Sequence, residues 1–534
     1  MNAVHPPLPR RLWLVLFPLL VAGCVPSAQP VAPSGTVRLT VLHLNDVYQF
    51  APMDGGRIGG LARVSTLRKQ VLAQSPNTLT LFAGDTLAPS VESITEVDGK
   101  PLRGQQMIDA WNALGVDYAV PGNHDFDFGD AVLRERIQAS RFPWLAANII
   151  DNHTGRPFEG LEPYALRELG GVKVGLFGVL LAETEVSSSV SQDTHIQEFC
   201  KAARPVVSRL RAQGATVIIA LTHLELEQDR QLARCVPVDV IIGGHDHERI
   251  EDRSTGTPIF KVAADAVELG RLTLDVDESS GTVRKLDWRV LKVTNKVQED
   301  PSFAVAMRRY DSLVAELAQP VGQTTVPLDA RKKAVRSQET NLGSLIADAL
   351  RDAAGTDVTL VNGGAIRGDT VFPAGELARR EILSIFPYAD KLVRMEVTGA
   401  VLLEALENAV SKSAEDPEPG RFLQVSGLRF AFDVKRPKGQ RVLCATVGGK
   451  PLSPTARYSV ATLSFITSGK DGYEMFRGLP TTAALDGDRT PREVLGEALR
   501  TGKPSPMKKG DGRIQRLSGA GASDKYCAPA SASL

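Results

Sequence analysis

Five short apolar runs in the first half of the chain each lead into a residue type that binds metal ions. The runs lie at 40–44, 79–83, 118–120, 217–221 and 240–242. The residues that follow or end them are Asp46, Asp85, Asn123, His223, and the pair His245 and His247. Short apolar runs bounded by turn residues predict buried strands, and α/β proteins place functional residues at strand ends. We therefore expect one sheet to carry all five strand ends and to bring these side chains together.

These six side chains form a mixed oxygen and nitrogen donor set that contains no thiolate. Such a set suits Mn, Zn, Fe or similar divalent ions and does not suit a Cys-rich structural zinc site. Six donors exceed what one tetrahedral ion needs, so the sequence predicts two divalent metal ions bridged by a carboxylate. The alternative for any single motif is that Asn, His and Asp serve as ordinary turn formers.

Residues 37–288 alternate β-branched or Leu-rich runs with amphipathic helical patterns, at 60–72, 104–114, 130–139 and 200–213. This alternation predicts an α/β domain with a mostly parallel or mixed sheet covered on both sides. The stretches 269–276 and 283–293 are typical of an antiparallel hairpin that closes the domain. An amphipathic helix is expected at 300–317, either as a connector between two domains or as a surface helix of the first.

The length of 534 residues exceeds what one hydrophobic core usually serves, so a second domain is expected. Its pattern predicts a helix at 340–351, strands at 358–361, within 421–430 and at 458–462, and a Gly-containing loop at 465–473. Lys+Arg and Asp+Glu both number 62, and this zero net charge gives no basis for a nucleic-acid polymer as a partner.

The N-terminus has the order of elements of an export signal. Two arginines precede an apolar run at 12–22 that is too short to span a bilayer comfortably. Residues 21–24, Val-Ala-Gly-Cys, resemble the bacterial lipobox. The resemblance implies a signal peptide over 1–23 and a lipid on Cys24. Because Val25 is not acidic, it also implies an outer-membrane anchor facing the periplasm or the cell surface. A plain secretory signal with an incidental cysteine is the alternative.

Outside the leader, the ends of the chain and the remaining cysteines give further expectations. Residues 24–36 are rich in Pro, Ala and Ser, which predicts a flexible tether, and the small polar tail 518–534 is expected to be disordered. Four cysteines remain after Cys24, and an oxidising compartment favours one or two disulfides. A Cys200–Cys235 pair would lie in the first domain and a Cys444–Cys527 pair in the second, but the sequence settles neither.

The metal-binding residue types, together with the motif Asn-His-Asp-Phe-Asp at 123–127, resemble the secreted bacterial 5′-nucleotidase family over about residues 38–500. The resemblance implies a four-layer α/β/β/α calcineurin-like metallophosphatase domain at 37–293. A linker helix at 294–320 and an α/β (α+β in part) substrate-binding domain at 321–517 would follow it.

The resemblance also implies a role for each residue of the first domain's site. One ion would be held by Asp46 and His247, the other by Asn123, His223 and His245, with Asp85 bridging the two. His124 would be the catalytic imidazole that stabilises charge on the phosphate, and Asp127 would orient it.

In the second domain the resemblance implies a nucleotide-binding site. Phe422 and Phe465 would sandwich the base, Asp471 would accept hydrogen bonds from the ribose, and Arg367 would meet the phosphate. Asn362 and Gly364 would line the same site. Core packing at strand ends is the alternative for the two phenylalanines. The segment at 386–390, Phe-Pro-Tyr-Ala-Asp, departs from the family's Pro-Phe-Gly-Asn.

Tyr48 is the main departure from the family pattern, because a His ligand usually stands two residues after the first Asp. Three alternatives remain open: a phenolate ligand, a ligand replaced by water, or a hydrogen bonder beside the ions. His43 lies inside an apolar run and is expected in the core. His195 and Asp246 are interpreted as structural.

The function that the resemblance implies is removal of phosphate from 5′-nucleotides outside the cytoplasm by a metal-bound hydroxide. We expect a monomer that is tethered to the membrane and acts on small-molecule nucleotides. Alternatives are a nucleotide-sugar pyrophosphatase, a 2′,3′-cyclic phosphodiesterase, or a non-catalytic nucleotide-binding surface lipoprotein.

Overall fold

The computed structural model describes residues 35–517 except 98, 389, 415–418 and 488. The expected leader, Cys24, nearly all of the tether and the tail 518–534 therefore lie outside the described residues. Within the described ranges, no helix combines the length and the apolar composition that a membrane crossing requires.

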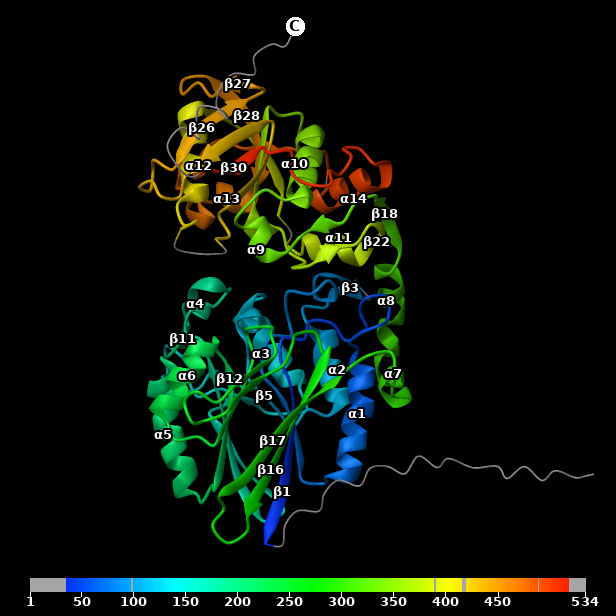
Figure 1. The fold of residues 1–534 in the computed structure, drawn as a ribbon, viewed down its shortest axis with the longest axis vertical. Helices are drawn as coiled ribbons and strands as arrows, with labels where there is room; N and C mark the ends of the chain where they lie inside the picture. The colour runs from blue at the N-terminus through cyan, green and yellow to red at the C-terminus, as the bar shows by residue number, and fades with distance from the viewer. Residues whose placement is uncertain (1–34, 98, 389, 415–418, 488, 518–534) are drawn as a thin grey trace, which may run out of the picture.

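Two β-sheets form the centre of the first domain (Figure 1). One sheet has the order β17 (Val283–Lys292), β16 (Glu268–Asp277), β1 (Thr36–Leu44), β2 (Thr78–Phe82), β5 (Tyr118–Ala119), β6 (Trp144–Leu145) and β8 (Leu161–Glu162). The other has the order β14 (Ile250–Asp252), β15 (Ile259–Lys261), β13 (Val240–Gly243), β12 (Val217–His223), β10 (Val172–Leu180) and β9 (Tyr164–Leu169). The prediction that one sheet carries all five metal-binding strand ends is therefore wrong.

The two sheets pack face to face because their central strands are apolar on both faces. Alternate residues such as Leu39 and Val41 of β1 meet Val217 and Ile219 of β12 in one buried cluster between the sheets. The opposite faces join a second cluster with the helices. Such two-sided burial is why these runs are continuous in hydrophobicity instead of alternating.

Helices cover the outer faces of the two sheets (Figure 1). On one side lie α1 and α2, and on the other α5 and α6. The first domain's helices are α1 (Leu61–Gln74), α2 (Gln105–Leu114), α3 (Asp130–Ala139), α4 (Thr184–Ser187), α5 (Phe199–Ala212) and α6 (Leu226–Cys235). The expected helices and the closing hairpin are confirmed with small shifts at their ends. A disulfide joins Cys200 to Cys235, as one of the two expected pairs, whereas Cys527 of the other pair lies outside the described residues.

The connector expected as one helix is interrupted. It consists of α7 (Pro301–Met307), a tight turn at Arg308–Tyr310, and α8 (Asp311–Leu317). At the turn, the ring of Tyr310 is buried against Phe50, and its hydroxyl donates to Asp109 Oδ2 at 2.6 Å. This anchoring fixes the turn to the first domain, and β18 (Pro320–Thr324) then enters the second.

The second domain is built on a five-stranded sheet. Its order is β24 (Leu423–Ser426), β20 (Val358–Asn362), β28 (Arg457–Leu463), β23 (Leu392–Thr398) and β29 (Thr482–Ala483). A four-stranded sheet lies beside it, with the order β27 (Lys450–Pro451), β26 (Val442–Val447), β25 (Leu428–Phe432) and β30 (Ile514–Arg516). Two buried clusters fill the domain; one holds residues of α10 (Asn341–Ala354) and α14 (Pro491–Thr501), the other residues of α12 (Gly399–Val410).

The strand expected within 421–430 is divided between the two sheets at Gly427. This residue has a positive φ of 72°. A Cβ here would lie 1.9 Å from the carbonyl oxygen of Asp357, so the division needs a glycine.

Short elements complete the structure. They are β3 (Glu96–Val97) with β4 (Lys100–Pro101), β7 (Ile149–Asp151) with β11 (Thr194–Ile196), β18 with β22 (Gly375–Ala378), β19 (Leu328–Asp329) with β21 (Val371–Phe372), and the helices α9 (Lys332–Val335), α11 (Arg379–Ile385) and α13 (Ser464–Thr467).

In one contact between the domains, Arg380 of α11 pairs with Glu92 at 3.0 Å and donates to Gln49. This contact places α11 over the loops at the strand ends of the first domain (Figure 1).

Candidate metal centre

The metal-binding residue types converge although they come from two sheets. Asp46, Asp85 and Asn123 follow β1, β2 and β5, whose strands run parallel in one sheet. His223 ends β12, and His245 and His247 follow the neighbouring parallel strand β13 of the other sheet. Because the carboxyl ends of both sets of strands point the same way, all six side chains meet at one end of the domain.

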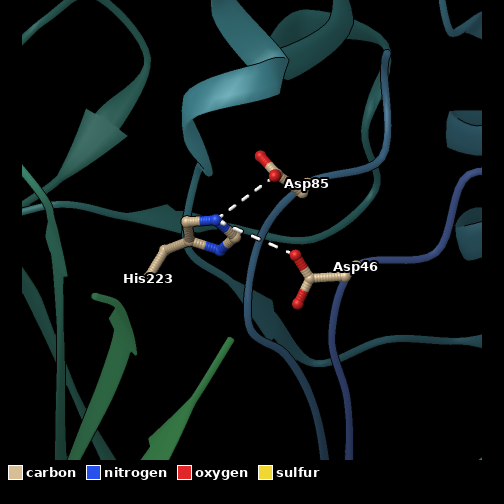
Figure 2. Close-up of side chains that lie close together, drawn as sticks. All are labelled: Asp46, Asp85 and His223. Atoms are coloured by element: carbon tan, nitrogen blue, oxygen red, sulfur yellow. Dashed lines mark ion pairs between the residues drawn. The ribbon is translucent and has the colours of Figure 1, made fainter. Parts of the chain in front are cut away.

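The donor atoms are spaced as ligands of common ions are spaced. His223 Nε2 lies 3.3 Å from Asp85 Oδ2 and 3.9 Å from Asp46 Oδ1 (Figure 2). Each of these three residues offers one donor atom within 4.8 Å of the others. Neighbouring donors that are each about 2.1 Å from one ion lie roughly 3 Å apart.

Further short distances define two groups of donors. In one group, His247 Nε2 is 3.2 Å from Asp46 Oδ1. In the other, His245 Nδ1 is 3.1 Å from Asn123 Oδ1. His223 contacts both groups, since its Nε2 lies near Asp85 and Asp46 and its ring lies edge-on to that of His245.

Two buried atoms at the centre have no hydrogen-bond partner: Asp46 Oδ1 and His223 Nε2. His223 Nδ1 is 2.8 Å from the carbonyl oxygen of Ala83, which accepts only if Nδ1 carries the proton. Nε2 then faces two carboxylates, either as an N–H group or, once a cation takes the place of its proton, as a lone-pair donor. Since buried polar groups are rarely left unpaired, the donor set fits a bound cation.

Electrostatics within the cluster keep the carboxylates charged. Burial alone would raise the pKa of Asp85, but His223 and His124 hold it well below its usual range. Burial lowers the pKa of His223, yet Asp85 and Asp46 raise it to about 9. Burial and the charge of His223 lower the pKa of His245 to about 4. The site therefore holds its negative charges in place and selects for a cation beside them.

Four of the donor residues have backbone conformations that side chains rarely adopt. The φ angles are 53° at Asp46, 66° at Asp85, 82° at His245 and 59° at His247. Such conformations persist only where the surroundings enforce them, and they cluster at functional sites.

Asp125 is one residue that enforces this geometry, and the sequence did not single it out. Its buried carboxylate accepts hydrogen bonds from the backbone N–H groups of Asp85, Thr86, Leu87 and Gly122, at 2.8 to 3.1 Å. It thereby fastens the loop after β2 to the loop after β5. Its place between His124 and Phe126 in the motif was the available signal, but an Asp in a turn has many ordinary uses.

The hydroxyl of Tyr48 lies within hydrogen-bonding distance of two of the donor residues. It is 3.2 Å from Asp85 Oδ2 and 3.2 Å from His247 Nε2. Burial, and then the charges of Asp85 and Asp46, raise the pKa of this phenol well above its usual value. The geometry supports the alternative in which Tyr48 is a neutral hydrogen bonder beside the metal-binding residues.

His124 is placed at the edge of the centre with its expected partner. Its Nδ1 is 2.7 Å from Asp127 Oδ2, and its backbone N–H donates to Asp85 Oδ1 at 2.8 Å. Burial lowers the pKa of this imidazole, but Asp85 and Asp127 raise it more, so the net shift is upward. The positive charge of Arg367, from the second domain, opposes this shift and lowers the pKa of the same imidazole.

Three of the six second-domain residues expected to bind substrate, Asn362, Gly364 and Asp471, lie together. Asn362 Nδ2 donates to Asp471 Oδ2 at 3.0 Å. Gly364 lies against Gly420, and Gly420 faces Asp471. Arg367 packs against Tyr388. Its guanidinium lies 5.2 Å from the centre of the Tyr388 ring and donates a hydrogen bond to the Tyr388 hydroxyl.

The prediction for Phe422 is wrong in this structure. Its side chain is 0% exposed and packs against Phe432, with ring centroids 6.2 Å apart. Phe465, in contrast, is 37% exposed. Phe422 directly precedes β24, and the cluster around α12 and β25 encloses its ring, so the core-packing alternative holds for this residue.

The residues expected to be structural are placed as such. His43 is fully buried and accepts a hydrogen bond from Trp288 Nε1 at 2.9 Å. His195 pairs with Glu185 at 2.8 Å away from the centre, and Asp246 pairs with Lys261.

Comparison with known proteins agrees with this arrangement. Residues 39–249 match the family described as calcineurin-like phosphoesterase, and residues 320–478 match the 5′-nucleotidase C-terminal domain. The trifunctional nucleotide phosphoesterase protein YfkN of Bacillus subtilis is 29% identical over 90% of this chain, which spans only 35% of that protein. The snake venom 5′-nucleotidase of Naja atra is 27% identical over 89% of this chain and 98% of its own.

A solved structure shares both domains. The 5′-nucleotidase precursor from Thermus thermophilus superimposes with a TM-score of 0.76 at 28% identity, covering 90% of this chain and 100% of its own. The two matched domains occur in the same order as the two domains of the structure. The chain therefore belongs to the 5′-nucleotidase family of metallophosphoesterases, enzymes that hydrolyse phosphoric esters.

Proposed function

We propose that this protein is an exported, metal-dependent phosphohydrolase that removes phosphate from 5′-nucleotides. The observation that carries the proposal is the convergence of six metal-binding side chains beside His124 and its partner Asp127. The names of the relatives support a nucleotide as substrate.

Two divalent metal ions, Mn, Zn, Fe or similar, would occupy the centre. Asp46 and His247 would hold one, Asn123, His223 and His245 the other, and Asp85 both. When bound, such ions lower the pKa of water and neutralise charge on a phosphoryl group.

The chain's own residues would orient and stabilise the substrate. Asp127 accepts a hydrogen bond from the Nδ1–H group of His124. When the ring is protonated, Nε2–H is then free to donate to a phosphoryl oxygen. The upward pKa shift of His124 favours this protonated form. Arg367 would bind a second phosphoryl oxygen, because guanidinium groups match phosphate geometry.

The second domain would recognise the nucleoside. The exposed ring of Phe465 offers a stacking surface for a base, and stacking contributes about 1–3 kcal/mol per base. Asp471 would accept hydrogen bonds from the ribose beside Asn362 and Gly364. In this arrangement, residues 37–293 would hold the metal ions, residues 294–320 would connect the two domains, and residues 321–517 would bind the substrate. The lipobox-like motif supports export and an anchor on Cys24.

The test is phosphate release from 5′-AMP by residues 36–534 loaded with Mn²⁺, compared with a chelated sample. We expect metal-dependent release that falls about 10²–10⁴-fold in kcat in His124→Ala, since that is the usual contribution of a positioned acid. His195→Ala is the matched control, because it removes another imidazole paired to a carboxylate but away from the centre. Equal loss in both variants, or no release from folded, metal-loaded protein, would refute the proposal.

The relative described as trifunctional supports a substrate panel beyond AMP. UDP-glucose and 2′,3′-cyclic AMP distinguish the pyrophosphatase and cyclic phosphodiesterase alternatives. A non-catalytic nucleotide-binding lipoprotein would bind AMP but release no phosphate from any of the three.

A further inference from the structure

Lys261, the last residue of β15, is a fully buried cation next to the metal centre. Its side chain is 0% exposed. The ammonium pairs with Asp229 Oδ2 at 2.6 Å and with Asp246 Oδ2 at a shorter distance. It also donates to the carbonyl oxygens of Leu224 at 2.7 Å and Gly244 at 2.9 Å. A buried ammonium is tolerated only when its donors are satisfied in this way.

Three of these four partners adjoin a histidine of the metal centre. Leu224 follows His223, and Gly244 precedes His245. Asp246 separates His245 from His247. One ammonium group therefore holds the chain at all three histidines, across the ends of two strands.

The fourth partner reaches the same strand end by a second path. Asp229 of α6 accepts a hydrogen bond from the hydroxyl of Thr222, the residue before His223, at 2.6 Å. The space is closed on the other side by Gly243, where a Cβ would lie 2.8 Å from Lys261 Cε. The side chain of Lys261 is thus enclosed by the residues that it contacts.

We propose that Lys261 is a positioning residue that holds His223, His245 and His247 at metal-binding spacing. The inference deepens the proposed function and rests on its metal ions. The loop needs such an anchor because His245 and His247 both have positive φ angles, which the local backbone does not favour by itself. Replacing the lysine would leave two carboxylates without their cation, and their repulsion would move Asp246 and the histidines on either side.

The experiment is calorimetric titration of the metal-free full chain, purified in detergent, with Mn²⁺ and with Zn²⁺. We expect Lys261→Met to lower metal affinity about 10–100-fold, which is the usual effect of removing a group that orients ligands. Asp246→Asn weakens only the pair between Lys261 and the partly exposed Asp246, so it should lower metal affinity less than Lys261→Met. This milder variant tests the proposal if Lys261→Met does not fold.

The matched control is Arg513→Met in the second domain. Arg513 is also buried and paired, with Asp348 at 2.7 Å, but it lies far from the histidines in the fold. It should lower thermal stability and leave metal affinity unchanged. The proposal is overturned if the folded Asp246→Asn and Lys261→Met variants bind metal as tightly as the parent. Metal-loaded parent that releases no phosphate would instead refute the proposed function alone.

Discussion

Asp125→Asn is the substitution whose effect the structure determines most directly. In the native carboxylate, Oδ1 accepts the N–H groups of Thr86 and Leu87, both at 2.9 Å. Oδ2 accepts those of Gly122 at 2.8 Å and Asp85 at 3.1 Å. An asparagine has the same size but keeps only one acceptor oxygen, and its NH₂ group would face two N–H groups.

The magnitude follows from the two buried donors that lose their acceptor. Each unsatisfied donor costs about 1–3 kcal/mol, so we expect about 2–6 kcal/mol of lost stability in the first domain. A domain of this size shifts its melting temperature by about 2–4 °C per kcal/mol. The melting temperature should therefore fall by at least about 4 °C, and metal affinity should fall with it because Asp85 loses its backbone anchor.

The measurement is thermal and urea unfolding of the parent and the variant under the same metal-free conditions. Asp54→Asn is the control, because the Asp54 side chain is half-exposed and forms an ion pair with the nearby Arg57; it should change stability by less than about 0.5 kcal/mol. A loss below about 1 kcal/mol for Asp125→Asn would refute the claim that this carboxylate holds the two loops together.

Three further outcomes are expected. Asp127→Asn should lower the pKa of His124, since Asp127 is one of the two carboxylates that raise it against burial; a reaction that needs the imidazolium would then lose kcat/KM at a lower pH, and an unmoved alkaline limb in the pH–rate profile would contradict this. Replacing Cys200 and Cys235 by Ser removes a cross-link over a separation of 35 residues, which the chain-entropy relation values at about 3–4 kcal/mol; the urea midpoint should fall, and an unchanged midpoint would count against it. Tyr48→His should tighten binding of the metal ion proposed at Asp46 and His247, because it adds an imidazole donor, whereas Tyr48→Phe should not. Equal metal affinities of the two variants in calorimetry would argue against a neutral Tyr48 beside the ions.

The sequence placed the metal-binding residue types at strand ends, as the structure has them, because this signal is local. Each donor ends or follows a short apolar run, and a buried strand followed by a polar loop can be recognised without knowing its neighbours. The helix at Asp130–Ala139 and the hairpin of β16 and β17 were predicted for the same reason. The role of Asp125 was missed because its four partners include three residues that lie about 40 positions away along the chain.

Side-chain exposure in the second domain was not predictable in the same way. Phe422 and Phe465 both stand at ends of strand-like runs beside turn-rich loops, so their sequence surroundings look alike. Only the packing of α12 and β25 around one of them decides that Phe422 is buried while Phe465 is exposed.

By itself the sequence determined which side chains could bind metal, that they stand at strand ends, and where the helices between them lie. The tertiary structure decided that two sheets, and not one, deliver them to a common point. The reason is physical: the hydrophobicity of a strand specifies that both its faces are buried, but it does not specify whether a helix or a second sheet covers each face. Strand pairing within the second sheet, where β13 lies between β15 and β12, also brings Lys261 beside the chain at three histidines, a contact that no local pattern encodes.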